Sequence, residues 1–186
     1  MKQLVEAKDK EIFWEQPKVS QRNFFLRSEE ATFGQLEFNS SFSTMAVATL
    51  GDVQWTLKRV GFFSTRITIR QAGSVVDFAT YHPKWTGSQG LVRFASGEEY
   101  TWNVANFMST RYTFSRTGGL ELITYLSGSR TKKFPNIFKQ EARVSIAPDA
   151  WLTKELPILV LLGWYLVILQ NEDSSAVAVT ASYGML

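Results

Sequence analysis

The sequence predicts a mainly β fold, a barrel of roughly twelve strands that encloses one hydrophobic helix near the C-terminus, at about residues 157–170. Two observations support this prediction. The first three-quarters of the chain repeatedly alternates apolar and polar residues, and a period of two is typical of strands with one face in water. Residues 157–169, in contrast, would be apolar on every side of a helix, so such a helix must be surrounded on every side.

The alternation is clearest in four segments, which are also rich in β-branched and aromatic residues: 53–58, 66–70, 100–104 and 111–115. Glycine-containing turns separate such segments at short intervals. Gly97-Glu98 and Gly118-Gly119 each predict a tight hairpin between two of them. The spacing of turns predicts roughly ten to twelve strands, as in an all-β barrel or sandwich.

The pattern changes near residue 148. Pro148-Asp149 suits a helix start, and Pro157 must kink the helix or restart it, because proline cannot donate a backbone hydrogen bond. The polar residues Asn171 to Ser175 predict the end of the apolar helix. Ala176 to Thr180 alternate small and β-branched residues, which is compatible with a final strand.

The apolar run is short for a membrane span. Leu156 to Leu169 would form about 21 Å of helix, whereas a bilayer core is about 30 Å thick. We therefore interpret the run as a buried core helix and do not expect a transmembrane protein. A membrane anchor and an exposed helix that binds a partner are the alternatives.

The bulk composition fits a single domain spanning residues 1–186. The chain has no cysteine, which excludes disulfides, thiolate nucleophiles and cysteine-ligated metals, and its net charge is only +3. The N-terminal residues contain no apolar segment typical of a signal peptide. We expect a cytoplasmic protein that is peripheral at a membrane.

A β-rich region followed by the apolar run from Leu156 to Leu169 resembles the tubby C-terminal-like superfamily, which includes tubby proteins and phospholipid scramblases. The resemblance is architectural and covers most of the chain. It implies a twelve-stranded barrel threaded by a hydrophobic helix. For some members of the group it also implies binding of phosphoinositides or other anionic lipids.

Residue patterns for catalysis are missing. His82 is the single histidine, which with no cysteine precludes the usual zinc sites, and the chain lacks a Gly-x-Ser-x-Gly motif and a phosphate-binding glycine loop. The paired carboxylates Glu29-Glu30, Glu98-Glu99 and Glu172-Asp173 are typical of solvated turns. We predict a protein that is not an enzyme and needs no metal or cofactor. An enzyme with an unrecognised carboxylate site is an alternative.

One segment, Ser129 to Val144, is strongly basic. Against Glu141 it holds five cations, the candidate anion-binding residues Arg130, Lys132, Lys133, Lys139 and Arg143, with two phenylalanines between them. Such a segment can bind an anionic headgroup, although a solvated hairpin is the plainer interpretation.

These observations favour a non-enzymatic binding module that contacts anionic phospholipid or a membrane surface. Its expected partners are anionic lipid headgroups or a protein, and we do not expect nucleic acid. An intracellular scaffold for protein interactions is the alternative.

Overall fold

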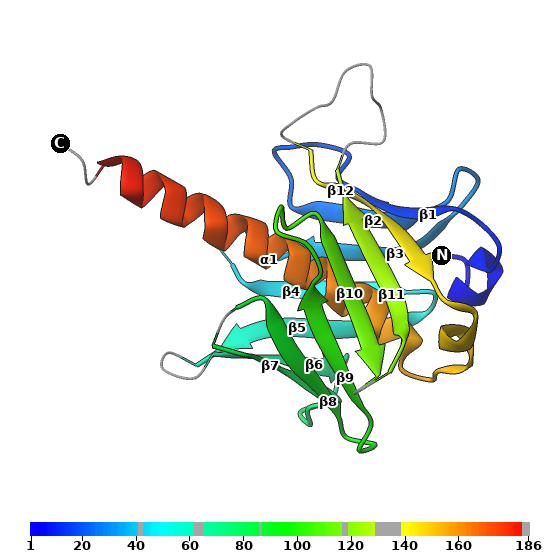
Figure 1. Cartoon of the computed structure of the whole chain (residues 1–186). Helices are drawn as coiled ribbons and strands as arrows, with labels where there is room; N and C mark the ends of the chain where they lie inside the picture. The colour runs from blue at the N-terminus through cyan, green and yellow to red at the C-terminus, as the bar shows by residue number, and fades with distance from the viewer. Residues whose placement is uncertain (41–42, 62–64, 86, 117–118, 129–138, 184–186) are drawn as a thin grey trace.

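The computed structural model describes residues 1–186 except 41–42, 62–64, 86, 117–118, 129–138 and 184–186. In this described part of the chain, twelve antiparallel strands form one closed barrel (Figure 1). Each strand pairs with its neighbours in sequence, and β1 pairs with β12 to close the barrel. The strands are β1 (Ile12–Glu15), β2 (Asn23–Arg27), β3 (Thr32–Phe38), β4 (Met45–Leu50), β5 (Val53–Val60), β6 (Arg66–Gln71), β7 (Ala79–Pro83), β8 (Gln89–Phe94), β9 (Glu99–Val104), β10 (Arg111–Arg116), β11 (Glu121–Ser127) and β12 (Glu141–Ile146).

The helical elements are short except for one. Two 3-10 helices, η1 (Leu4–Ala7) and η2 (Pro148–Leu152), precede β1 and follow β12, and α1 (Leu156–Tyr183) threads the barrel (Figure 1). The predicted fold class is therefore confirmed. A closed twelve-stranded barrel around an apolar helix is also the architecture of the tubby-like fold.

The alternation of apolar and polar residues in the sequence corresponds to an alternation of buried and exposed side chains along the strands. In β4, Ala46, Ala48 and Leu50 face inward and are buried, while the residues between them are partly exposed. Large aromatic side chains fill much of the remaining interior. Those that are almost completely buried are Trp14, Phe24, Phe33, Tyr100, Trp102, Tyr112, Phe114, Tyr125, Trp164 and Tyr165.

The first half of α1 is the centre of this core. Its side chains from Ile158 to Leu169 are buried, apart from Gly163, which has none. A Cβ atom on Gly163 would lie 2.4 Å from the ring of Tyr125, so glycine lets that ring approach the helix. The Tyr125 hydroxyl donates toward the carbonyls of Leu159 and Val160, at 3.0 and 3.1 Å.

The predicted C-terminal boundary of the helix is wrong. The polar residues 171–175 do not end α1, and residues 176–180 continue it to Tyr183 instead of forming a strand. Ser174 and Ser175 donate their hydroxyls to the carbonyls of Gln170 and Asn171, four residues earlier, which is a bond that serine makes within a continuing helix. Pro157 lies in the first turn of α1, where no backbone donor is needed, so it restarts the helix after η2.

Among the described residues, one helical segment, Leu156–Ser175, is long and apolar enough to cross a membrane. Its most apolar window is 72% buried inside the barrel. That burial is what a core helix requires, and it agrees with the interpretation of residues 157–169 as a core helix.

Antiparallel strands place successive connections at alternating ends of the barrel. We call the end at which α1 leaves the barrel the mouth; the connections from β1 to β2, β3 to β4, β5 to β6, β7 to β8, β9 to β10 and β11 to β12 belong to it. We call the opposite end, where the chain passes from β12 through η2 into α1, the foot (Figure 1).

Candidate functional site

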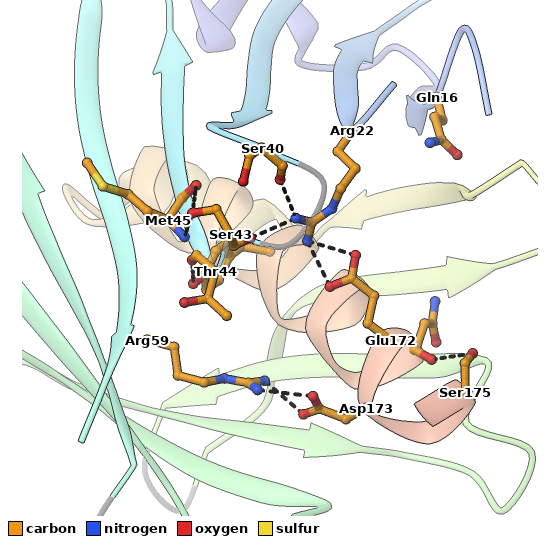
Figure 2. A network of polar contacts seen from close by, with 12 residues as sticks. Gln16, Arg22, Ser40, Ser43, Thr44, Met45, Arg59, Glu172, Asp173 and Ser175 are labelled. Atoms are coloured by element: carbon orange, nitrogen blue, oxygen red, sulfur yellow. Dashed lines mark hydrogen bonds and ion pairs between the residues drawn. The ribbon is translucent and has the colours of Figure 1, made fainter. Parts of the chain in front are cut away.

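Two ion pairs hold α1 at the mouth. Arg22, in the connection just before β2, contacts both carboxylate oxygens of Glu172 at 2.7 Å. Arg59, on β5, forms a bidentate pair with Asp173 at 2.8 and 3.0 Å (Figure 2). The two arginines, from different parts of the barrel, therefore form ion pairs with adjacent carboxylates of the helix. This pairing explains how two adjacent acids are accommodated there.

Arg22 also orders the connection between β3 and β4. Its guanidinium donates to the carbonyls of Ser40 and Ser43 at 2.9 and 2.7 Å (Figure 2). The guanidinium also lies 3.8 Å from the ring centre of Phe38. The hydroxyl of Tyr165 donates to the Thr44 carbonyl of the same connection. Burial raises the pKa of Tyr165 well above its ordinary value, so this hydroxyl keeps its proton.

A cavity of about 660 Å³ opens beside α1 at the mouth. Its walls include apolar side chains of the strands β6, β7 and β9 and of the helix, with polar groups around them. The lining comprises Arg59, Thr65, Ile67, Tyr81, Pro83, Gly87, Ser88, Trp102, Val104, Asn106, Phe107, Ser109, Leu166, Leu169, Gln170, Asp173 and Ser174. The size is within the range of small-molecule sites, and this lining can accommodate an apolar group that carries a polar end.

The cavity wall depends on a close approach between two strands. Tyr81 on β7 lies over Gly90 on β8, where an added Cβ would be 2.2 Å from the tyrosine ring. Burial raises the pKa of Tyr81, with a smaller opposing effect of Arg59, so the phenol stays neutral and can act as a hydrogen-bond donor. Burial lowers the pKa of Arg59, but the hydrogen bonds and charge of Asp173, together with the charges of Tyr165 and Glu172, raise it above its ordinary value.

Of the five predicted anion-binding residues, the structure describes two, and these two lie in different places. Arg130, Lys132 and Lys133 lie outside the described residues. Lys139 lies two residues before β12 at the mouth, and the intervening Gln140 exchanges hydrogen bonds with Gln16 of the β1 to β2 connection. Arg143 lies on the outer wall of β12 and donates to Glu11 at 2.8 Å, so it points towards the foot.

The connections at the mouth are basic. Their described residues include no Asp or Glu and four cations: Lys18, Arg22, Lys84 and Lys139. Because Arg22 and Arg59 neutralise the two helix carboxylates, Lys18 and Lys84 face solvent without a carboxylate partner in the described contacts. By sequence alone, residues 129–138 add three further cations and no anion.

The connections at the foot have the opposite charge. Their described residues include a single cation, Lys154, and seven carboxylates: Glu29, Glu30, Asp52, Asp77, Glu98, Asp149 and Glu155. The N-terminal residues 1–11, at the same end, carry three basic and three acidic side chains. The connections are therefore basic at the mouth and acidic at the foot, where Lys10 and Arg70 pair with Glu30 and Asp77, although the whole chain has a net charge of only +3.

The carboxylate pairs that might form an enzyme site do not line the large cavity as pairs. Glu99 is paired with Arg93 at 2.6 Å on the outside of the β8–β9 hairpin, and Glu98 is exposed in its turn. His82 is exposed on β7. No group of three or more His, Cys, Asp or Glu side chains within the described part of the chain is placed to hold a metal ion.

Several residues of the mouth were not identified from the sequence. Lys18, Lys84, Trp85 and Phe107 are spread over three short turns with at most one cation each among them, whereas the basic segment 129–144 has five cations close together. A signal for them does exist. In a barrel whose strands follow one another, odd-numbered turns share one end, so summing charge over alternate turns would have revealed the basic mouth and the acidic foot.

The sequence matches no protein family, no curated protein and no solved structure with which it was compared. The chain's own charges, cavities and exposed side chains are therefore the evidence for its function.

Proposed function

We propose that this protein is a non-enzymatic module that binds anionic phospholipid surfaces through the mouth of its barrel. The observation that carries the proposal is the unequal charge of the two ends. A mouth that carries Lys18, Lys84 and Lys139 is attracted to an acidic leaflet, and an acidic foot is repelled from it. The separation of charge would therefore orient the molecule as well as attract it.

The original candidates Arg130, Lys132 and Lys133 belong to this proposal. They lie between Ser127 and Lys139 in the sequence, and both of these residues are at the mouth. Arg143 is less suited to the role because Glu11 already neutralises it. We place the protein at the cytoplasmic face of a membrane, where acidic lipids are concentrated, as a peripheral protein whose apolar helical segment 157–169 stays in its own barrel.

The proposal includes kinship with the tubby C-terminal-like superfamily, and the shared architecture supports it. The lipid binding of some members favours the same ligand class. The cavity beside the basic connections is lined partly by apolar side chains such as Trp102, Leu166 and Leu169, which also suits a lipid better than a polar metabolite.

Vesicle co-sedimentation tests the proposal. We expect binding to phosphatidylcholine vesicles only when they contain phosphatidylserine, and we expect binding to fall steeply as salt rises. The double variant Lys18→Glu/Lys84→Glu should bind at least about tenfold more weakly, since each basic residue near an acidic surface contributes about 1 kcal/mol. Lys132→Glu/Lys133→Glu should lose affinity in the same way.

A matched variant separates position from net charge. Lys8→Glu/Lys154→Glu changes the net charge by the same amount, but at exposed positions of the foot. It should bind nearly as well as the unmodified protein. Equal binding to neutral and acidic vesicles, or equal losses in the mouth and foot variants, would refute attachment through the mouth.

A further inference from the structure

Two loops of the mouth expose large apolar side chains to solvent. Trp85, in the connection between β7 and β8, is 103% exposed relative to the reference residue. Phe107 and Met108, in the connection between β9 and β10, are 99% and 74% exposed. We call these three residues the apolar rim. Side chains of this size are normally covered in a folded protein, and full exposure of several together marks an interaction site.

The loop structure holds Phe107 and Met108 outward. The Asn106 side chain accepts hydrogen bonds from the backbone N–H groups of Thr110 and Arg111, both at 2.9 Å, and donates to the Thr110 hydroxyl at 2.7 Å. The ends of the loop are therefore fastened. Phe107 and Met108 lie between these fastened ends, and their side chains are exposed.

The β7–β8 loop is constrained in a similar way. The Gly87 N–H donates to the Lys84 carbonyl at 2.9 Å, which closes a turn that has Trp85 as its second residue. Gly87 has φ of +68°, a conformation that glycine adopts readily. The two loops are joined by a bond of 2.7 Å from the Val104 N–H to the Ser88 carbonyl, so the apolar rim belongs to one supported surface.

Phe107 of the apolar rim lies beside the point where α1 leaves the barrel. Phe107, together with Ser88 of the β7–β8 loop, lines the same cavity as Gln170 and Ser174 of the helix. From Ser174 onward the sequence has no charged residue, and the helix continues outward to Tyr183 (Figure 1). These ten residues measure about 15 Å, roughly half the thickness of a bilayer core. A charged helix here would keep a membrane away from the rim, whereas an uncharged one can enter the lipid with it.

The foot also has exposed apolar residues, but they are mainly aliphatic. Val75, Val76, Leu120 and Leu152 are 68–87% exposed, whereas the aromatic Phe78 is only 40% exposed, and the connections at the foot are acidic taken together. Trp85 instead follows Lys84 directly in a mouth without described loop carboxylates. Aromatic side chains next to cations are the combination that partitions into the headgroup layer of a membrane.

We infer that the apolar rim Trp85, Phe107 and Met108 inserts into the interface of an anionic bilayer and supplies a salt-resistant part of binding. The inference rests on the proposed function and deepens it. Electrostatic attraction by the mouth would bring the protein to the surface, and insertion of the rim would then hold it with the helix tip directed into the lipid.

The test uses the full chain and vesicles of phosphatidylcholine with phosphatidylserine. The variant Trp85→Ser/Phe107→Ser/Met108→Ser should bind at least about tenfold more weakly at low salt, since three large apolar side chains no longer enter the lipid. It should also lose the binding that the unmodified protein retains at high salt. Val75→Ser/Val76→Ser/Leu152→Ser, the matched change at the foot, should bind like the unmodified protein.

Fluorescence supplies a second measurement. The difference in emission between the unmodified protein and Trp85→Phe reports on Trp85, and it should shift to the blue and be quenched by brominated lipid when vesicles are added. Circular dichroism should show unchanged folding of all variants, since the changed side chains are exposed.

Two outcomes would overturn the inference while leaving the proposed function intact: acidic-vesicle binding that is equal in the rim and foot variants, or a Trp85 emission that vesicles do not change. Failure of the unmodified protein to prefer acidic vesicles would instead refute the proposed function. A concentration-dependent dimer in vesicle-free sedimentation, lost in the rim variant, would assign the rim to a second copy of the chain and also overturn the inference.

Discussion

The two halves of α1 share one helical backbone but lie in different surroundings. In the inner half, Leu156–Leu169, nearly all side chains are buried in the barrel. The outer half begins at Gln170, and its described side chains become steadily more exposed from there to Ser175. The boundary is marked by the ion pairs of Glu172 and Asp173 with arginines of the barrel.

The two halves of α1 show that the end of an apolar run and the end of a helix are separate events. What ends near residue 170 is the barrel around the helix. The backbone hydrogen bonds that define a helix continue beyond it, because polar side chains at the mouth either pair with arginines or bond to the preceding turn.

A buried charge should separate the two halves most strongly. Leu162 is completely buried, so Leu162→Asp places an unpaired charge in a dry core and should unfold the protein at neutral pH. Ser174→Asp introduces the same residue at an exposed position of the outer half and should change stability by no more than about 0.5 kcal/mol. Circular dichroism and urea unfolding of both variants are the measurements, and a folded Leu162→Asp would contradict the buried inner half.

Adding a single methyl group to the inner half should also destabilise the protein. The added Cβ of Gly163→Ala would meet the Tyr125 ring at 2.4 Å, and overpacking of this kind costs about 1–3 kcal/mol. Ser175→Ala, in the exposed outer half, should be nearly neutral. In urea unfolding, the cost of Gly163→Ala should shrink in a Tyr125→Leu background. An unchanged cost in that background would mean that another contact limits the space at Gly163.

The sequence predicts the inner half better than the outer half for a physical reason. A run that is apolar on all sides has few possible environments, so residues 157–169 indicate a core helix directly. Residues 171–175 are ambiguous, because their fate depends on Arg22 and Arg59, which lie far away in the sequence. No local pattern contains those partners.

The candidate site, like α1, can be predicted from the sequence only in part. The strand alternation predicts the barrel, but the mouth is assembled from six connections spread over most of the chain. Lys139 can be picked out from the sequence because it belongs to a dense basic segment. Lys18 and Lys84 are recognised as candidates only once the topology places their turns at the same end of the barrel. Arg143, which is equally prominent in the sequence, is neutralised by Glu11 in the structure.

Alkaline pH should weaken the contacts around the inner half. Burial, together with the charge and hydrogen bond of Glu155, raises the pKa of Tyr100 to about 12, from an ordinary value of 10.0. The unfolded chain therefore releases this proton at lower pH than the folded protein does. The stabilisation is fully present below pH 10 and is lost as pH rises from about 10 to about 12.

Urea unfolding at a series of pH values checks this expectation. Burial raises the pKa of Tyr125 and Tyr165 as well, and their losses should extend the decline to higher pH. Tyr100→Phe should decline less between pH 10 and pH 12 than the unmodified protein. An identical slope for the two would show that Tyr100 does not contribute to the pH dependence.

The smallest expected effect lies at the boundary between the halves, in the coupling of the two ion pairs. Double-mutant cycles that combine Arg22→Met with Glu172→Gln, and Arg59→Met with Asp173→Asn, measure each pair separately in urea unfolding. The Arg59 pair should contribute about 0.2–1 kcal/mol, as partly solvated pairs do, because the Asp173 side chain is 60% exposed. The Arg22 pair should contribute more, because the Arg22 side chain is only 14% exposed and water screens it less. Raising the salt concentration should reduce the Arg59 coupling by the larger fraction. Coupling near zero in both cycles would mean that packing of the inner half alone positions α1, and that the ion pairs merely accommodate the carboxylates where the helix leaves the barrel.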